Sequence, residues 1–250
     1  MQIRVALVPE LAGEVSSAVC VVIDMLRATT VIPTLFDRGC PKVYVADTHQ
    51  KARRFARANG YILCGETEGF KVEDFDFGNS PTEFARMDFT NKPVVLSTTN
   101  GTKATVMAAG ARKVFLGATI NRMAVAQEAW FSAIETDSDI VLICSGTRDQ
   151  FTLEDATAAG LYAEAFAGFG SPDQIPTFAD SAIACRRLWQ SEPNLLRGLM
   201  EGNHARTLAD RGFGEDIGFC SQIDRLSQIP ILTLESDAAS APCPVILVKG

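Results

Sequence analysis

Several features common in binding and membrane proteins are missing from this chain of 250 residues. No apolar run approaches the roughly 20 residues that a transmembrane helix needs, so we expect no membrane partner. None of the seven cysteines belongs to a Cys-x-x-Cys pair, which argues against a zinc site. No basic stripe offsets the net charge of −7, which argues against nucleic acid as a partner.

The composition is typical of a globular protein. Hydrophobic residues make up 47% and charged residues 21% of the chain, and because no linker is recognisable we treat residues 1–250 as one domain. The first residues lack the charged and apolar regions and the cleavage site of a signal peptide. An odd number of cysteines, mostly within apolar runs, indicates reduced thiols in the core and a cytoplasmic location.

Short apolar runs alternate with helix-like segments along the first two thirds of the chain. This alternation predicts an α/β fold, which we interpret as a three-layer sandwich with a mostly parallel or mixed sheet. The last third is expected to be more helical, with helices over residues 178–190, 195–211 and 215–226 and a late edge strand over 244–248. A closed eight-fold barrel would suit the length, but the last third offers too few strands for it.

Three helix ends are predicted from their capping residues. Gly60 is expected to end a helix over residues 49–59. Ser80 opens a Ser-Pro-x-Glu pattern, which is typical of a capping box. Thr152 is expected to begin another helix in the same way, with Asp155 at its third position.

The segment VVIDMLRATT, residues 21–30, joins a buried-strand pattern to three kinds of polar group. Apolar β-formers lead into Asp24, then Arg27, then the hydroxyls of Thr29 and Thr30. Open α/β sheets bind ligands in the loops at the carboxyl ends of their strands. An acid can hold a metal ion, an arginine can bind an anion with two hydrogen bonds, and hydroxyls can bind phosphate oxygens. The alternative is structural, with Asp24 capping a helix and Arg27 pairing with it.

Four further segments repeat this form, because each apolar run in them ends in small, hydroxyl, amide or acidic residues. They are residues 61–69, 94–102, 114–121 and 140–149. Parallel strands place such ends at one edge of a sheet, so we expect these polar loops to converge on one site.

The loop at residues 98–102, TTNGT, has the composition of an anion cradle. Asn100 and Gly101 tolerate positive φ, so successive backbone N–H groups could turn inward at a helix start. The loop lacks the Gly-x-x-x-x-Gly-Lys spacing of a P-loop. A simple Asn-Gly turn is the alternative.

Seven motifs along the chain carry a family resemblance. In order, they are Val22-Ile23-Asp24-x-Leu26-Arg27-Ala28-Thr29-Thr30, Cys64-Gly65-Glu66, Phe75-Asp76-x-Gly78-Asn79-Ser80-Pro81-x-Glu83, Thr98-Thr99-Asn100-Gly101-Thr102-x-Ala104, Gly117-Ala118-x-x-Asn121, Leu153-Glu154-Asp155-Ala156-x-Ala158-Ala159-Gly160 and Leu208-x-x-x-Gly212-Phe213-x-x-Asp216-Ile217. They resemble the 2-phosphosulfolactate phosphatase family of coenzyme M biosynthesis, over nearly the whole chain. The resemblance implies a three-layer α/β fold and a magnesium-dependent phosphatase that converts 2-phosphosulfolactate into sulfolactate and phosphate.

One stretch departs from that family. Its members have a basic residue and two glycines after the strand that ends in Gly65-Glu66, whereas this chain continues Thr67-Glu68-Gly69-Phe70-Lys71. The additional acid and the bulky side chain are expected to affect the choice of substrate more than the type of reaction.

Phosphate ester hydrolysis needs charge neutralisation at the phosphoryl oxygens, a nucleophile and help for the leaving oxygen. Mg²⁺ prefers oxygen ligands and keeps several waters, so one or two carboxylates suffice. Asp24 and Glu66 are the first candidate ligands and catalytic acids, with caps or salt bridges as their alternatives. Asp155 is the third ligand candidate, although a capping box would also explain it, and Glu154 is a further catalytic candidate.

Arg27 is the first candidate to bind the substrate's anionic groups, because a guanidinium can bind phosphate, carboxylate or sulfonate at two points. Arg148 is the second. Arg27 is also a candidate catalytic residue. The other predicted substrate contacts come from the polar loops and are Thr29, Thr30, Asn79, Thr98, Thr99, Asn100, Gly101, Thr102, Ser145 and Gly146.

No side chain is assigned as the nucleophile. Asp24 does not begin an Asp-x-Asp-x-Thr pattern and Cys64 does not begin a Cys-x5-Arg loop, so we predict a metal-activated water. Of the two histidines, His204 is a candidate general acid from the last third of the chain.

Two other functions are open. One is a phosphatase for another small 2-phosphohydroxy acid, such as phospholactate or phosphoglycerate. The other is a non-catalytic protein that binds a small anion and needs no metal. The expected partner is a small phosphorylated organic acid, and a homo-oligomer is compatible with the sequence.

Overall fold

The computed structural model describes residues 1–170, 175–233 and 243–249. Within these residues eleven strands form one mixed sheet, in the order β5-β4-β6-β3-β11-β10-β7-β2-β8-β1-β9. The strands are β1 (Gln2–Ala6), β2 (Val19–Ile23), β3 (Val43–Val45), β4 (Ile62–Thr67), β5 (Phe70–Lys71), β6 (Val94–Ser97), β7 (Lys113–Gly117), β8 (Ile140–Cys144), β9 (Thr177–Phe178), β10 (Pro230–Thr233) and β11 (Val245–Val248).

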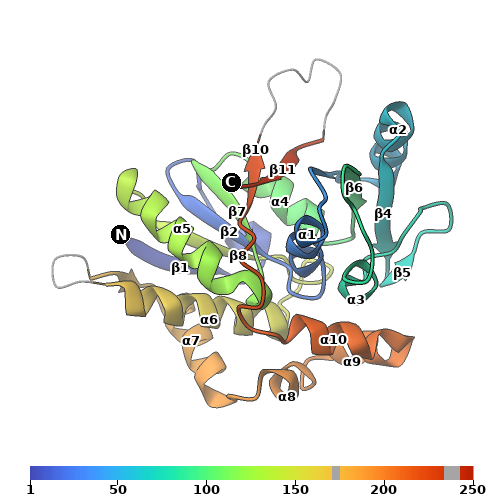
Figure 1. Cartoon of the computed structure of the whole chain (residues 1–250). Helices are drawn as coiled ribbons and strands as arrows, with labels where there is room; N and C mark the ends of the chain where they lie inside the picture. The colour runs from blue at the N-terminus through green and yellow to red at the C-terminus, as the bar shows by residue number, and fades with distance from the viewer. Residues whose placement is uncertain (171–174, 234–242, 250) are drawn as a thin grey trace.

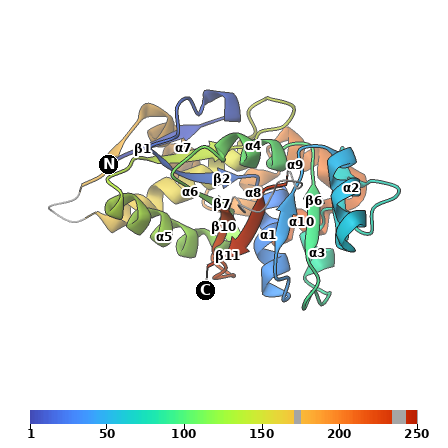
Figure 2. The ribbon, with the colours of Figure 1, turned by 90° about the horizontal axis from the view of Figure 1, so that it is seen from above.

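Helices lie on both faces of this sheet (Figure 1, Figure 2). The α-helices are α1 (Ala28–Asp37), α2 (His49–Asn59), α3 (Pro81–Phe84), α4 (Gly101–Ala108), α5 (Arg122–Glu135), α6 (Leu153–Phe169), α7 (Asp180–Ser191), α8 (Leu195–Leu199), α9 (Asn203–Leu208) and α10 (Gly214–Cys220). Helices α5 and α6 pack with the central strands in one hydrophobic cluster, whereas α1 and α4 pack in another on the opposite face. The predicted three-layer α/β sandwich with a mixed sheet is therefore confirmed.

The central strands are buried along their whole length. Every residue of β2, VCVVI, and of β8, IVLIC, is buried, as is typical of strands covered by helices on both faces. Strand β2 pairs in parallel with β7 on one side and β8 on the other. The carboxyl end of β2, which Asp24 follows, is therefore fixed by a neighbouring strand on each side.

Two groups of parallel strands flank an antiparallel hairpin. Strands β4, β6 and β3 form one group, and β7, β2, β8, β1 and β9 form the other. The hairpin of β10 and β11 lies between them and pairs antiparallel with both. The two groups are steeply inclined to one another (Figure 1), as accumulated sheet twist produces.

Several local predictions are confirmed. Helix α2 spans residues 49–59, and Gly60 follows it with a left-handed φ of 67°. Ser80 caps α3, since its Oγ accepts a hydrogen bond from the N–H of Glu83 at 3.2 Å. All seven cysteines are buried and free of disulfide bonds.

Other predictions are wrong at the level of tertiary structure. Strand β11 is an interior strand between β3 and β10, not an edge strand. The helix predicted over residues 195–211 is divided into α8, α9 and a π-helical turn, Ala209–Phe213, and the one predicted over 215–226 ends at Cys220. No helix in the described part of the chain combines the length and the apolar character needed to cross a bilayer.

Candidate active site

Asp24 lies between the end of β2 and the start of α1. Its N–H donates to Thr29 Oγ1 at 2.9 Å, and its Oδ1 accepts from the N–H of Ala28 at 3.1 Å. Its other oxygen, Oδ2, faces Gly101 at the start of α4, where a Cβ atom would lie 2.5 Å away. The structural alternative for Asp24, a helix cap, is thus realised by Oδ1 alone.

Glu66 joins the loop after β4 to the loop after β6. Its Oε1 accepts from the N–H of Thr99 at 2.8 Å, and its Oε2 accepts from the N–H of Gly69 at 2.7 Å. The side chain is buried and lies along a cavity. Two backbone donors therefore fix this carboxylate in position.

Asp155 lies in the first turn of α6 and connects two further loops. Its Oδ1 accepts from the N–H of Met25 at 2.9 Å, and its Oδ2 accepts from the N–H of Gly146 at 3.0 Å. The predicted capping box is wrong, because the Thr152 side chain makes no capping hydrogen bond. The carboxylate instead holds the loops after β2 and β8 together.

Glu154, the neighbour of Asp155, forms a buried pair with His204 of α9. The Nδ1 atom of His204 lies 2.6 Å from Glu154 Oε1. The second oxygen, Glu154 Oε2, is buried and has no hydrogen-bond partner within the described residues. Both side chains lie along the cavity.

These carboxyl groups disturb one another's protonation. Burial raises the pKa of Asp24 to about 6, the Ala28 N–H and His204 lower it, and the charges of Glu66 and Glu154 raise it further. Burial and the charges of Asp24 and Glu154 also raise the pKa of Asp155 well above its usual value. The carboxyl groups therefore carry more negative charge than His204 balances, and a bound cation would relieve this excess.

The same negative charges stabilise the protonated form of His204. Burial lowers its pKa, but the hydrogen bond and charge of Glu154 and the charge of Asp24 outweigh burial and raise it. The imidazole therefore holds its proton more firmly than a free histidine does.

The residues present fit a magnesium ion by their chemistry. Asp24, Glu66 and Glu154 supply oxygen atoms, and one of these, Glu154 Oε2, is buried without a partner. The described residues contain no ready-made group of three or more His, Cys, Asp or Glu side chains in metal-binding geometry. Mg²⁺ retains waters and needs one or two carboxylates, so magnesium stays a prediction that this donor set suits.

The cavity beside these groups has a volume of about 670 Å³. It is lined by Glu66, Thr99, Asn100, Arg148, Glu154 and His204, among others. Cavities of several hundred Å³ hold small organic ligands. The polar loops after β4, β6 and β8 therefore converge as predicted, although the sheet that carries them is mixed.

Besides Glu154 Oε2, five buried polar side-chain atoms lack hydrogen-bond partners within the described residues. They are Asn79 Oδ1, Thr98 Oγ1, Ser145 Oγ, Thr147 Oγ1 and Thr152 Oγ1. Buried polar atoms are normally satisfied, so a set of unsatisfied ones indicates a missing ligand or water. Three of the five are predicted substrate contacts, whereas Thr147 and Thr152 were not predicted as contacts.

The remaining predicted hydroxyls bond within the protein. Thr29 Oγ1 donates to Gly117 O at 2.7 Å, Thr30 Oγ1 donates to Met25 O at 2.9 Å, and Thr102 Oγ1 donates to Thr98 O at 2.8 Å. These bonds give the three hydroxyls a structural role, and substrate binding by them stays a prediction.

The Asn-Gly loop differs from the expected cradle. Asn100 has a φ of −118°, and Gly101 begins α4 without a positive φ. Gly101 is needed for a different reason, because a Cβ there would lie 2.7 Å from Ala28 Cβ as well as close to Asp24. Asn100 Oδ1 accepts from the N–H of Arg148 at 3.2 Å, which joins this loop to the one after β8.

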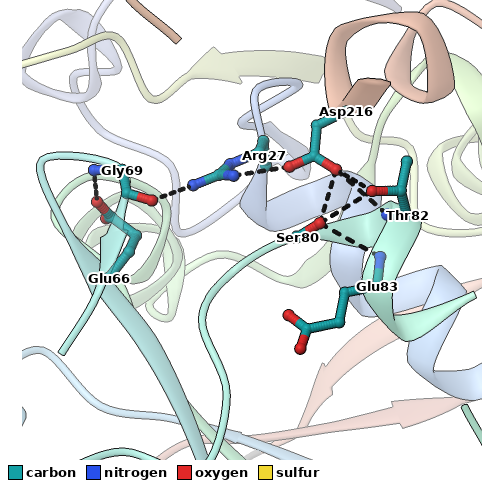
Figure 3. Close-up of polar contacts among 7 residues, drawn as sticks. All are labelled: Arg27, Glu66, Gly69, Ser80, Thr82, Glu83 and Asp216. Carbon is teal, nitrogen blue, oxygen red and sulfur yellow. Dashed lines mark hydrogen bonds and ion pairs between the residues drawn. The ribbon is translucent and has the colours of Figure 1, made fainter. Parts of the chain in front are cut away.

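Arg27 is buried, and both of its terminal nitrogens are hydrogen-bonded (Figure 3). Its Nη1 donates to Asp216 Oδ2 at 2.7 Å, its Nη2 donates to Gly69 O at 2.8 Å, and its Cζ lies 4.3 Å from the centroid of the Phe213 ring. It pairs with Asp216 rather than Asp24, which corrects the structural alternative. Asp216 also accepts from Ser80 Oγ at 2.7 Å, so this cluster ties α10 and α3 to the turn that positions Glu66.

Sequence reasoning missed Asp216, whose role appears only when α10 folds back over α3. The motif Gly212-Phe213-x-x-Asp216 contained it, without indicating its partner.

The thiols of Cys64 and Cys144 are near the loops, but burial raises the pKa of both well above the usual value. Neither thiol therefore forms the thiolate that a nucleophile requires.

Comparisons with known proteins identify the family of this chain. Residues 6–235 match the family model described as 2-phosphosulpholactate phosphatase. A probable 2-phosphosulfolactate phosphatase of Symbiobacterium thermophilum is 34% identical over 226 residues, which cover 89% of this chain and 94% of that protein. Proteins with the same description from Pseudothermotoga lettingae and Carboxydothermus hydrogenoformans are each 33% identical, over 90% and 92% of this chain and 93% and 92% of their own length. The chain therefore belongs to the 2-phosphosulfolactate phosphatase family.

Proposed function

We propose that this protein is a magnesium-dependent phosphatase that hydrolyses 2-phosphosulfolactate to sulfolactate and phosphate. The observation that carries the proposal is a group of four buried carboxyl groups, Asp24, Glu66, Glu154 and Asp155, of which Glu66 and Glu154 line one cavity. Unsatisfied polar atoms of Thr147, Thr152 and Glu154 line the same cavity. An anion-binding protein would gain nothing from carboxylates near its ligand. The family membership supports the same reaction.

Asp24 and Glu66 are the residues that would hold the magnesium ion. Each keeps its carboxylate in place through backbone N–H donors, from Ala28 for Asp24 and from Thr99 and Gly69 for Glu66. When bound, the ion supplies charge neutralisation at the phosphoryl oxygens and activation of water. We assign Asp155 a positioning role, since its carboxyl group joins the loop that carries Asp24 to the loop after β8.

The phosphoryl oxygens need neutral donors as well as positive charge. Asn79, Thr98 and Ser145 place side-chain polar atoms in the buried region without protein partners. A hydroxyl can donate to a phosphate oxygen, whereas the unpartnered atom of Asn79 is Oδ1, which only accepts. We assign Thr98 and Ser145 to the phosphoryl group.

His204 is suited to protonate the leaving oxygen. Glu154 binds its Nδ1, which leaves Nε2 to face a ligand and raises the basicity of the ring. In the reaction, water adds to phosphorus, the bond between phosphorus and the C2 oxygen of sulfolactate breaks, and the proton on His204 Nε2 passes to that oxygen. A proton released by the attacking water restores the balance.

Phosphate release from 2-phosphosulfolactate, with magnesium and with excess chelator, tests this proposal. Phospholactate, phosphoglycerate and an aryl phosphate are assayed in parallel. Selective release from phosphosulfolactate that stops with chelator supports substrate, reaction and metal together. Release from another 2-phosphohydroxy acid alone would show that the proposed substrate is wrong. Release unaffected by chelator would show that the reaction does not depend on magnesium. Ligand binding without any release would favour the anion-binding protein.

A further inference from the structure

Three charged side chains meet on the exposed side of the cavity, and the reaction above does not use them. Glu68 lies in the turn between β4 and β5, Arg148 in the loop after β8, and Arg211 in the π-helical turn before α10. Arg148 Nη2 donates to Glu68 Oε1, and Arg211 Nη1 donates to the backbone oxygen of Glu68. Arg211 Nη2 also lies 3.7 Å from Glu68 Oε2. One acidic residue thus holds two guanidinium groups from distant parts of the chain.

These two guanidinium groups are the ones available to a ligand in the cavity. Among the residues that line it, Arg148 and Arg211 are the arginines, and the other lining cation is His204. Arg27 is buried elsewhere and bonded to Asp216 and Gly69. Arg211 is oriented further by the ring of Phe70, whose centroid lies 5.6 Å from its Cζ, a cation–π contact.

The proposed substrate has an anionic group that this pair would suit. With its phosphate beside Asp24 and Glu66, 2-phosphosulfolactate still presents a sulfonate at its other end. A sulfonate has three acceptor oxygens and a fixed negative charge, which match the planar donor edges of two guanidinium groups. Glu68 offers the same two arginines a carboxylate. Its side chain therefore occupies the position in which a distal anion would be bound.

The ion pair between Glu68 and Arg148 is weak enough for an incoming anion to replace it. The side chains of Glu68 and Arg148 are 53% and 68% exposed. Exposed ion pairs are weak, because water screens the attraction and both long side chains lose freedom. Glu68 can therefore swing into solvent without leaving a buried charge behind, while Arg211, which is 29% exposed, stays against Phe70.

We propose that Arg148 and Arg211 form the subsite for the distal sulfonate of the substrate, and that the Glu68 carboxylate occupies this subsite until the sulfonate displaces it. A substrate with a distal sulfonate displaces the carboxylate and gains both arginines. A substrate without one leaves Glu68 in place and gains neither. This inference rests on the proposed function, because it takes the phosphate end of the substrate to lie beside the carboxylate cluster.

Glu68→Gln tests the proposal, because it removes the competing charge and keeps the size of the side chain. We expect the KM for 2-phosphosulfolactate to fall by about 1.5-fold to fivefold, the scale of an exposed ion pair, and the KM for 2-phospholactate to stay unchanged. Arg211→Gln should raise the KM for phosphosulfolactate alone. Glu201→Gln is the matched control, because Glu201 lines the same cavity and its change alters the net charge equally.

Equal falls in KM for both substrates, or the same shift in Glu201→Gln, would show a general charge effect and overturn the proposal. A rise in KM for phosphosulfolactate in Glu68→Gln would overturn it too. Calorimetric titration of sulfolactate and lactate separates this inference from the proposed reaction. If the wild type hydrolyses nothing, tighter binding of sulfolactate alone by Glu68→Gln supports the subsite, and unchanged binding refutes it.

Discussion

Arg27 combines a sequence position typical of a ligand-binding residue with a buried environment in which both of its terminal nitrogens already have partners. Its guanidinium lies between Asp216, Gly69 and the ring of Phe213. Sequence reasoning placed it in the site because the residues around it are those of a strand-end loop. The partner that occupies it lies 189 residues later in the chain, and no local pattern predicts such a contact.

Arg27→Met is expected to destabilise the protein. The change leaves the Asp216 carboxylate buried without its cation, a loss of about 3–5 kcal/mol for buried pairs. Urea unfolding measures it. Arg27→Met/Asp216→Leu, which removes both charges, should recover much of the loss. Wild-type stability together with a raised KM would instead make Arg27 a substrate-binding residue.

His204→Gln should lower kcat for 2-phosphosulfolactate by about 10²–10⁴, the usual contribution of a general acid. It should change the hydrolysis of 4-nitrophenyl phosphate little, because that leaving group needs no proton. His49→Gln is the control, since His49 bridges Ser97 Oγ at 3.0 Å and Thr67 Oγ1 at 2.9 Å outside the proposed reaction. Equal losses on both substrates would exclude the general-acid role.

The starts of α1 and α4 lie so close together that only a glycine fits at the contact. Gly101 begins α4, and a Cβ there would come within 2.5 Å of Asp24 Oδ2 and 2.7 Å of Ala28 Cβ. Two helix N-termini consequently point at the same region, where the amide groups favour negative charge. The TTNGT motif predicted a helix start at this place, although its glycine serves close approach rather than a turn.

Gly101→Ala should reduce kcat/KM for phosphosulfolactate by at least about 10²-fold, because the methyl group pushes Asp24 and α1 away from α4. Gly110→Ala is the matched control, since nothing lies within 4 Å of a Cβ at that position. Thermal unfolding of both variants checks the fold. Undiminished activity in Gly101→Ala would show that the contact between these helices does not set the geometry of the site.

Helix boundaries that depend on local capping were predictable from sequence, and those that depend on tertiary contacts were not. Gly60 and Ser80 do what their residue types favour. Asp155 has the spacing of a capping residue, yet it binds the N–H groups of Met25 and Gly146. The two oxygens of Asp155 are both occupied by N–H groups of converging loops, so its side chain does not cap its own helix. The sequence does not show which loops supply those donors.

At the scale of the whole molecule, the convergence of the strand-end loops was predictable and the sheet that produces it was not. The pattern of apolar runs ending in polar residues placed Glu66, Ser145 and Asp24 at the carboxyl ends of strands, and they lie at the ends of β4, β8 and β2. The hairpin of β10 and β11 inserts between the two parallel groups, so no single parallel edge exists. Strand order follows from long-range pairing, and the short apolar run of β11 carries no information about its neighbours.

The core should protect every thiol in the native state. All seven cysteines are buried, and burial raises the pKa of Cys20 to about 12 and that of Cys40 and Cys185 to about 11. We expect no rapid reaction with a thiol reagent at pH 8, and seven reactive thiols after denaturation in guanidinium chloride. A fast-reacting native thiol would contradict the packing described for that region.

The most direct test of the account is phosphate release from 2-phosphosulfolactate by Asp24→Asn, measured against magnesium concentration beside the wild type. The substitution keeps the shape of the side chain and the acceptor for Ala28 N–H while removing the charge proposed to hold the metal. We predict magnesium-dependent release by the wild type and none by the variant, with an unchanged circular dichroism spectrum. Wild-type turnover by Asp24→Asn would contradict the proposed site.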